Sequence, residues 1–418
     1  MQCYQVMSAD ADFALICSLN GGDMEWPACA YENPMIMSLF PPTREEALAR
    51  IASVRPAEYA RSRNALTGAV TKLSPYITHG FVSLPEVLSG VRAQHAVHSQ
   101  DKFLFELGWR EYYRHVWQHR GDGIFKSLHE GVMPDDAYRQ DMPLDILHAC
   151  TGVAVVDMAV KTLYATGYLH NHARMWLASY VVHLRKVHWR VGADWLYGHL
   201  LDGDLASNHL SWQWVAGTGS HKPYLFNAEN VARYAPPEWH SAGSVVDTSY
   251  EALDEMARKP LADMSRALSL NPSVASPSLL ASPPPQCHVG QPDATVAKGR
   301  NVWLVHPWNL GDLPANLAED TLVIGIFVSE FHSAWPWDEK RWLFVACRMK
   351  ELASACWYGE AMSIQSALNG ANQVCGVQDL HIDPWLPTGE YQASPALFSN
   401  VDRPCGSFSK WWQIVSQV

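Results

Sequence analysis

The stretch that decides the fold runs from residue 168 to residue 214. It reads YLHNHARMW (168–176), then a helical run into HWRVGADWLYGHL (188–200), then LDGDLASNHLSWQW (201–214). Carboxylates, amides and an arginine lie here among several indoles. Because every buried polar group needs a hydrogen-bond partner, this mixture makes a poor plain core. It suits a cradle for a large, flat ligand with polar edges, and we expect the function to lie here.

Length and composition predict a soluble protein of two to three domains. The 418 residues are 48% hydrophobic and 17% charged, which is typical of well-buried globular chains. The net charge of −11 argues against a nucleic-acid binder, but the charge is uneven. Residues 44–233 carry about +2 and are rich in histidine, so most of the negative charge lies elsewhere. A basic face over this stretch is therefore compatible with the sequence.

The nine cysteines form no Cys-x-x-Cys pair, so neither a zinc site nor a disulfide framework is indicated, and we predict no metal. An iron–sulfur site that gathers distant cysteines is the minor alternative. Reduced thiols are typical of a cytoplasmic protein. The N-terminus has no basic region followed by an apolar run, and no stretch reaches 18 apolar residues, so we expect no membrane segment.

Residues 44–240 are predicted to form an all-helical domain, after an irregular lead-in over residues 1–43. From Thr43 the segment TREEALARIASV has a Thr N-cap and Glu in its first turn. Further helices are expected at 101–118, 155–166 and 171–187. The loop from Tyr59 to Gly80 carries hydroxyl residues beside Lys72, which suits phosphate binding, although such turns are common without a ligand.

The C-terminal part changes class. Residues 241–298 are predicted to be a linker rich in Ser, Pro and Ala. Residues 299–418 are predicted to form a small parallel α/β domain, because 302–306 and 321–328 are apolar β-branched runs. A helix over 339–356, a short strand from Gly376 and a Trp-rich tail helix near 408–415 complete it. The fold class is therefore α plus α/β, multidomain.

The helix at 101–118 places five side chains on one stripe, at spacings i, i+3, i+4, i+7 and i+11. They are Glu106, Trp109, Arg110, Tyr113 and Trp117. The plain interpretation is an amphipathic face with a Glu106–Arg110 ion pair, worth a few tenths of a kcal/mol, roughly. The stripe alone does not separate this interpretation from a binding surface.

Residues 44–220 resemble the FAD-binding helical domain of the DNA photolyases and cryptochromes. The matching motifs are Tyr59, TKLSP (71–75), ELGWREYYRH (106–115), TGYLHN (166–171), DGDLASN (202–208) and WQW (212–214). These blocks are long and in the family's order. The resemblance covers less than half of the chain.

The resemblance implies a U-shaped FAD in the helical domain. Its phosphates and ribityl chain would be held by the loop and by two arginines, and its polar edges and isoalloxazine by acidic and amide residues. The implied cofactor-binding residues are Tyr59, Thr71, Lys72, Leu73, Ser74, Arg110, Asn171, Arg174, Asp202, Asp204 and Asn208. Asn208 would lie next to N5, where a neutral amide both donates and accepts.

Glu106, Trp109, Met175 and Trp214 match the family's lesion pocket and, with Asn208, are the implied catalytic residues. An indole offers a flat surface on which a flipped-out pyrimidine dimer stacks. Glu106 would hydrogen-bond the pyrimidine carbonyl edge, which requires that it be at least partly protonated. An ordinary helix salt bridge remains the alternative for Glu106.

Trp212 and Trp189 match two members of the family's electron-transfer chain, and Tyr138 aligns with the third position, where the family usually has Trp. Core packing is the alternative for each ring. Val70 and Lys72 replace the usual hydroxyl residue and Arg of the phosphate loop, and Lys lacks bidentate geometry.

The stretch HKPYLFN (221–227) differs from the usual repair-enzyme segment, which leaves three candidates for DNA-phosphate contacts. They are Arg63, His172 and Lys222.

The family's α/β antenna domain normally precedes the helical domain. Here an α/β domain follows it, and VWLVHPWNLGDLP (302–314) looks faintly like the first strand and turn of that antenna domain. We therefore weigh a relocated antenna domain, with no residue pattern that identifies a second chromophore.

The resemblance implies light-driven DNA repair by a lyase, in which excited reduced FAD passes an electron to a cyclobutane pyrimidine dimer. The alternative is a cryptochrome-like blue-light photosensor that binds FAD without repair and has a signalling partner. A flavin-binding remnant with a structural role is a third. The expected partner is damaged DNA, and the expected state is a monomer.

Overall fold

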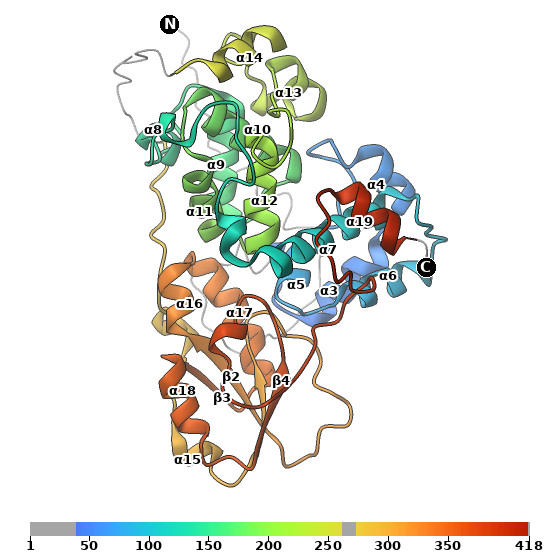
Figure 1. The fold of residues 1–418 in the computed structure, drawn as a ribbon, viewed down its shortest axis with the longest axis vertical. Coiled ribbons are helices and arrows are strands. Elements are labelled where there is room, and N and C mark those ends of the chain that lie inside the picture. The colour runs from blue at the N-terminus through green and yellow to red at the C-terminus, as the bar shows by residue number, and fades with distance from the viewer. Residues whose placement is uncertain (1–38, 261–272, 417–418) are drawn as a thin grey trace, which may run out of the picture. The chain divides into compact units, whose positions relative to one another are not determined.

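The computed structural model describes residues 39–260 and 273–416, all within one compact unit that spans Asn33–Val418. Up to residue 260 these residues form helices. They are α3 (Arg44–Ser53), α4 (Pro56–Ser62), α5 (Ser74–Thr78), α6 (Leu84–Arg92), α7 (Lys102–Arg120), α8 (Leu144–Leu147), α9 (Ala154–Thr166), α10 (Asn171–Ser179), α11 (Trp189–His199), α12 (Leu205–Ala216), α13 (Ala228–Tyr234) and α14 (Tyr250–Arg258) (Figure 1). Within residues 39–260, none belongs to a strand of the sheet. In the described part of the chain, we find no helix both long and apolar enough for a membrane crossing.

Local chemistry sets the ends of the helices that surround the site. Thr43 caps α3 by accepting from the Glu46 N–H, and the Asp204 carboxylate caps α12 by accepting from the Ser207 N–H. Gly167 and Gly217 end α9 and α12 with φ values of +66° and +82°. Because this left-handed region strains residues with a Cβ, glycine stops both helices cleanly.

The C-terminal part contains a five-stranded, fully parallel sheet in the order β3-β2-β1-β4-β5. Its strands are β1 (Asn301–Val305), β2 (Leu322–Val328), β3 (Ala355–Gly359), β4 (Gln373–Val377) and β5 (Glu390–Gln392). Its helices are α15 (Ala294–Ala297), α16 (Ser329–Ala334), α17 (Glu339–Leu352) and α18 (Ala361–Leu368), and the chain ends in α19 (Phe408–Val415). Every residue of β2 is buried, as its unbroken apolar run predicts. The strand order reverses between β1 and β4.

Several expected elements differ from the structure. The helix predicted to run to residue 356 ends at Leu352, and β3 starts at Ala355, where Trp357 and Tyr358 favour a strand. The loop expected over residues 59–80 contains the end of α4 and all of α5. Most of the predicted lead-in lies outside the described residues.

The prediction of a linker over residues 241–298 was wrong for α14. Leu253 and Ala257 of this helix are buried, and Lys186 Nζ donates to the carbonyls of Met256 and Ala257 at 2.7 Å each. The helical sequence YEALDEMAR stands inside a stretch whose richest Ser, Pro and Ala content lies later, over residues 268–298. The composition of the whole stretch therefore hid a helix that belongs to the helical part.

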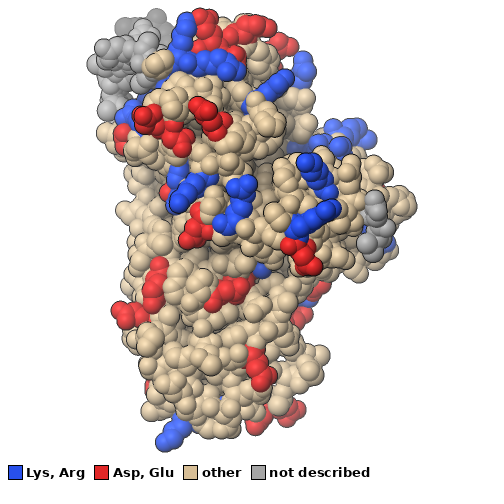
Figure 2. Space-filling view, in the orientation of Figure 1, with Lys and Arg blue, Asp and Glu red and all other residues tan. Residues whose placement is uncertain are grey.

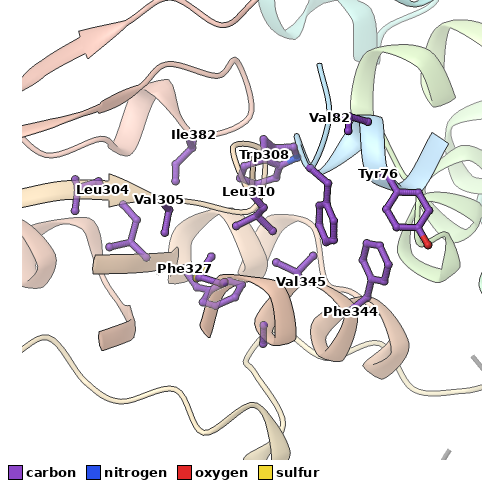
Figure 3. Close-up of a cluster of buried hydrophobic side chains, with 14 of the residues drawn as sticks. Tyr76, Val82, Leu304, Val305, Trp308, Leu310, Phe327, Phe344, Val345 and Ile382 are labelled. Carbon is purple, nitrogen blue, oxygen red and sulfur yellow. The ribbon is translucent and has the colours of Figure 1, made fainter. Parts of the chain in front are cut away.

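The helical part and the sheet share one core. Phe81 stacks on Phe344 of α17, with ring centroids 5.0 Å apart and an interplanar angle of 15°. Figure 3 shows Tyr76 and Val82 facing Phe344 and Trp308 across this cluster. The sheet is therefore packed against the helices through apolar contacts.

The C-terminal helix α19 packs on α7, beside which it lies in Figure 1. Phe408 and Trp411 are buried in this contact. A Cβ at Gly108 would lie 2.3 Å from the Trp412 ring, so a side chain there would displace the helix. The tail therefore covers one face of the helix that carries Glu106 and Trp109.

Candidate functional site

One cavity of about 620 Å³ brings together most of the residues singled out in the sequence. This volume is within the range of about 300–1,000 Å³ that is usual for cofactor sites. Its walls come from α4, the 70–74 loop, α7, α10, α12 and Asp202 of the segment Asp202-Gly203-Asp204, here called the acidic turn. The singled-out residues that line it are Tyr59, Arg63, Thr71, Lys72, Ser74, Glu106, Trp109, Arg110, Asn171, His172, Arg174, Met175, Asp202 and Trp214.

A buried ion pair fixes the floor of this cavity. Arg174 Nη2 donates to both carboxylate oxygens of Asp202, at 2.9 and 2.7 Å, and Arg174 Nε donates to the Leu169 carbonyl at 2.9 Å. The Asp202 side chain is 2% exposed. Removing one partner would leave the other charge buried and uncompensated, so the pair holds both groups in place.

Lys72 lines the cavity and has no carboxylate partner among the described residues. Its backbone has a φ of +51°, a conformation rare outside glycine and frequent at functional sites. Burial and the nearby Arg50 lower the pKa of Lys72. Within the described parts of the chain we find no carboxylate paired with its Nζ, and the hydroxyls of Thr71 and Ser74 line the same cavity. This corner suits an anionic group such as a phosphate.

Glu106 is paired across the cavity and not along its own helix. Arg63 Nε lies 3.4 Å from Glu106 Oε1, while Arg110 Nη2 donates to Thr78 Oγ1 at 3.0 Å and lies 3.5 Å from Asp204 Oδ2. The Glu106–Arg110 pair of the plain interpretation is therefore not the one observed. Burial raises the pKa of Glu106, and the charge of Arg63 opposes that rise.

The aromatic wall of the cavity is held from outside. Trp109 stacks on Phe408 of α19, with centroids 4.1 Å apart and an interplanar angle of 10°. Trp214 is 38% exposed, and its ring centroid lies 5.7 Å from that of Tyr224. Trp109 also lines the cavity, so Phe408 covers one face of the indole while part of the side chain borders the open space.

Seven further singled-out residues do not line this cavity, and they include Tyr138 and Lys222. Leu73 is a core residue, and Asp204 lines a second cavity of about 430 Å³ on the other side of the acidic turn. Asn208 is buried and donates from Nδ2 to the Ala193 carbonyl at 2.8 Å. Trp212 and Trp189 are each 2% exposed.

The two indoles and Tyr138 lie in the second core cluster. The Trp212 ring fills the space beside Gly192, where a Cβ would lie 2.3 Å away, and Trp189 Nε1 donates to Ser127 Oγ at 3.0 Å. The ring centroids of Tyr138 and Trp189 lie 6.2 and 5.6 Å from the centroid of the His188 ring. These contacts serve packing, and they also form a continuous aromatic path from Trp189 to Tyr138.

Sequence reasoning did not single out several contributors to the cavity, among them two serines and a phenylalanine that backs its wall. Ser207 and Ser211 line it from α12, and Phe408 backs Trp109 from a helix at the other end of the chain. The two serines lie seven and three residues before Trp214, which also lines the cavity, so the helical period could have indicated them. No local pattern links Phe408 to Trp109.

Residues 103–256 match a family model described as the FAD binding domain of DNA photolyase. A deoxyribodipyrimidine photo-lyase of Streptomyces griseus is 36% identical over 169 residues, 39% of this chain and 36% of that protein. A cryptochrome DASH of Ostreococcus tauri is 32% identical over 237 residues, 53% of this chain and 42% of that protein. The chain thus spans about two fifths of the length of these curated relatives.

Among solved structures, a Synechocystis cryptochrome aligns with a TM-score of 0.41 at 26% identity, covering 46% of this chain and 43% of that one.

The residues of the cavity fit FAD. An unneutralised cation with two hydroxyls suits the diphosphate, a fixed arginine–carboxylate pair offers polar contacts, and tryptophan, tyrosine and methionine line the remaining wall. The volume also suits a molecule of this size.

Proposed function

We propose that this chain, which belongs to the photolyase and cryptochrome family through its FAD-binding domain, is a light-driven lyase that repairs cyclobutane pyrimidine dimers in DNA. One observation carries the proposal: Glu106 and Trp109 line the same cavity as the cofactor corner. The cofactor corner is the group formed by Lys72, Thr71 and Ser74. A lesion in this space would lie directly against the cofactor.

FAD supplies the light-driven one-electron donor of this reaction when it is bound. Lys72 would bind its diphosphate, with Thr71 and Ser74 as hydroxyl donors. Arg174, fixed by Asp202, would donate to its polar edge. Tyr59 and Asn171 also line the cavity and would close the sides of the cofactor.

Trp109 and Trp214 would receive the lesion. A damaged base pair leaves the duplex at a cost of roughly a few kcal/mol, which is least where the pairing is already distorted. Stacking on an indole returns about 1–3 kcal/mol per base. Because Phe408 holds Trp109 from its outer face, the indole is set in position before the lesion arrives. Met175 lines the same wall and adapts to the shape of the dimer.

Glu106 would hold a proton at a carboxyl oxygen and donate it in a hydrogen bond to a pyrimidine carbonyl. Burial raises the pKa of Glu106, which increases the protonated fraction at a given pH. Arg63 opposes this rise, and a DNA phosphate that drew Arg63 away would strengthen it. The donated hydrogen bond would stabilise negative charge as it reaches the pyrimidine ring.

Asn208 is the fifth proposed catalytic residue; its Nδ2 donates to the Ala193 carbonyl, and its side chain does not line the cavity in this structure.

The DNA would be bound at the rim of the cavity. Figure 2 shows Lys and Arg side chains gathered more over the helical part than over the α/β part on this face. Arg63 and His172 line the cavity and would contact phosphates, with Lys222 as a third candidate. His172 stacks on Tyr234 at 5.2 Å and 21°, which fixes its ring at the rim. Phosphate contacts of this kind weaken steeply as salt rises.

Repair of an oligonucleotide with one cyclobutane dimer, by the FAD-loaded, chemically reduced protein under blue light, tests the proposal. Restored thymines that depend on light support it. An absence of repair in reduced protein with bound FAD would overturn it.

A blue-light photosensor is the second candidate, and the tail favours it. The helix α19 lies on the helix that carries Trp109, so a change at the cavity has a direct path to the C-terminus. Trp212, Trp189 and Tyr138 would then serve photoreduction of the flavin. Light-dependent reduction of bound FAD with no repair, and with salt-independent DNA affinity, would favour the sensor.

We also propose that the α/β domain is antenna-like. The second cavity lies beyond the carboxyl ends of β1 and β4, where the strand order reverses and open parallel sheets bind ligands. An absorption spectrum of purified protein with a band beyond those of flavin supports a second chromophore. A spectrum explained by flavin alone, after growth with full cofactor supply, argues against it.

A further inference from the structure

The acidic turn of the cofactor cavity is held from behind by the α/β domain. Arg341, on α17, is fully buried and donates from Nη2 to the Gly203 carbonyl at 2.5 Å. Its guanidinium lies over the ring of Trp337, at 4.0 Å, and over that of Tyr197, at 4.9 Å. A residue of the sheet domain thus contacts the backbone between Asp202 and Asp204.

The glycine of the turn leaves the space that this guanidinium occupies. A Cβ at Gly203 would lie 2.6 Å from Arg341 Nη1 and 2.8 Å from the Tyr197 carbonyl oxygen, so a side chain there would force the arginine away. Burial lowers the pKa of Arg341, while Tyr197 and the two carboxylates beside Gly203 raise it. The turn therefore compensates the buried charge only in part, because Arg341 Nε and Nη1 have no hydrogen-bond partner among the described residues.

Both ends of the turn are tied to the same domain. The Leu205 N–H donates to His381 Nε2 at 3.3 Å, and His381 Nδ1 lies 2.7 Å from Asp379 Oδ1, in the loop after β4. At the other end, the buried His79 ring bridges the carbonyls of Leu201, at 2.9 Å, and Pro307, at 2.6 Å. Pro307 follows β1, so loops after two neighbouring strands hold the two ends.

The opposite face of the turn belongs to the cofactor cavity. There the Asp202 carboxylate fixes Arg174, which lines the cavity. The turn is therefore a single short piece of backbone between two arginines, one in the core of the α/β domain and one at the cofactor. A displacement of about 1 Å in such a piece is enough to disturb a binding geometry.

We propose that Arg341 is a positioning residue of the cofactor site, which holds the Gly203 backbone and through it the carboxylate that orients Arg174. The inference rests on the proposed function only in that the cavity binds FAD. It makes the α/β domain a structural part of the FAD site, irrespective of any second chromophore. Arg341 does not touch the cofactor and acts through Gly203 and Asp202.

A purely structural role is the competing explanation, and the same helix offers a matched control. Arg348 lies seven residues after Arg341, is 7% exposed, and donates from Nε to the Leu310 carbonyl at 3.1 Å. It is also a buried arginine bonded to a backbone carbonyl, but its acceptor is not in the acidic turn. Loss of either guanidinium should lower stability, whereas loss of Arg341 alone should change FAD binding.

The experiment compares full-length wild type, Arg341→Lys, Arg341→Met and Arg348→Met. FAD affinity is measured by quenching of flavin fluorescence on the apoprotein, stability by urea unfolding of the apoprotein, and cofactor geometry by the visible circular dichroism of bound flavin. Because an unsatisfied carbonyl and a released carboxylate are left behind, R341M should bind FAD about tenfold more weakly or worse, with an altered flavin dichroism. R341K keeps the charge and should be intermediate, and R348M should stay within about twofold of wild type.

FAD affinity within about twofold of wild type in both Arg341 variants would overturn the inference, as would an equal loss in R348M. If R341M does not fold, R341K against R348M decides by the same criterion. A wild-type protein that binds no FAD would instead remove the proposed function, so the two failures are distinguishable.

Discussion

The two cavities on either side of the acidic turn differ in how their charges are satisfied. The larger one holds Lys72, for which the described residues offer no carboxylate partner, and Glu106, whose pKa is raised by burial. In the smaller one Arg114 Nη1 lies 2.9 Å from Asp379 Oδ2, and His381 also contacts that carboxylate. A site with unsatisfied charge is prepared for a charged ligand, whereas one with internally paired charge suits a neutral or planar one.

The turn itself shows the same contrast in two carboxylates separated by one residue. Asp202 points to the larger cavity and is fixed by Arg174, and Asp204 points to the smaller one, where it caps α12 and meets Arg110 at 3.5 Å. The first pair is shorter, and one arginine nitrogen donates to both carboxylate oxygens. The comparison therefore predicts that the two sides of one turn respond differently to the same substitution.

The largest effect is expected for Asp202→Ala. It leaves Arg174 without its carboxylate, and breaking a buried pair costs about 3–5 kcal/mol. Asp204→Ala removes a helix cap and a weaker ion pair, for which we expect about 1–2 kcal/mol. Urea unfolding of both apoproteins measures the difference. Equal losses in the two variants would contradict the contrast between the two sides.

The next effect concerns Lys72, which has no carboxylate partner within the part of the chain that the structure describes. Lys72→Met should weaken FAD binding by about 10- to 100-fold, because a charge-assisted hydrogen bond contributes about 1.5–3 kcal/mol. The apoprotein should not lose stability, since burial already disfavours this charge. The control is Arg114→Met in the smaller cavity, which should destabilise the apoprotein and leave FAD affinity nearly unchanged. Fluorescence titration gives the FAD affinity, and urea unfolding gives the stability of the apoprotein. If K72M were destabilised but bound FAD normally, Lys72 would be a structural residue and not a cofactor-binding one.

Much of the architecture could be predicted from the sequence because short local patterns specify the individual helices and strands. The apolar runs at 302–306 and 321–328 predicted β1 and β2, and the amphipathic FSKWWQIV segment predicted α19. β3 was missed because it follows α17 after two residues, with no glycine or proline between them. Local patterns thus predicted elements well where a break in composition marked their ends.

The cavity could be predicted only in part, for a different reason. Tyr59, Lys72 and Glu106 lie in blocks that resemble the family's, and Arg174 lies three residues after another such block. Arg341 contacts Gly203, which lies 138 residues earlier, and no motif contains it. Contacts of this range depend on how the sheet packs against the helices, which periodicity does not predict.

Glu106 gives a smaller effect that depends on pH. Its folded pKa is raised, so the folded state binds this proton more tightly than the unfolded chain, and stability falls as pH rises from the ordinary Glu pKa through the raised one. If the protonated carboxyl donates to the lesion, repair should decline with rising pH over the upper part of the same window. Glu106→Ala should lower repair about 3- to 10-fold, with FAD still bound.

Glu106→Gln is the matched variant, because its amide also donates but does not titrate. E106Q should retain most of the repair and show a flat pH profile in this window. Repair yields of wild type, E106A and E106Q, measured across this pH range, show whether the Glu106 carboxyl donates to the lesion. Equal repair by E106A and wild type would remove Glu106 from the mechanism.

The smallest effect tests whether the tail helix prepares the aromatic wall of the larger cavity. Phe408→Leu keeps an apolar side chain on α19 but removes the ring that stacks on Trp109, a contact worth about 0.5–1.5 kcal/mol. We expect affinity for dimer-containing DNA to fall about two- to fivefold. FAD affinity should not change, because the cofactor corner lies at Lys72. The control is Phe398→Leu, whose ring packs on Trp411 and Trp412 of the same helix. If F398L weakens lesion binding as much as F408L, the tail acts through its general packing and not through the Trp109 stack.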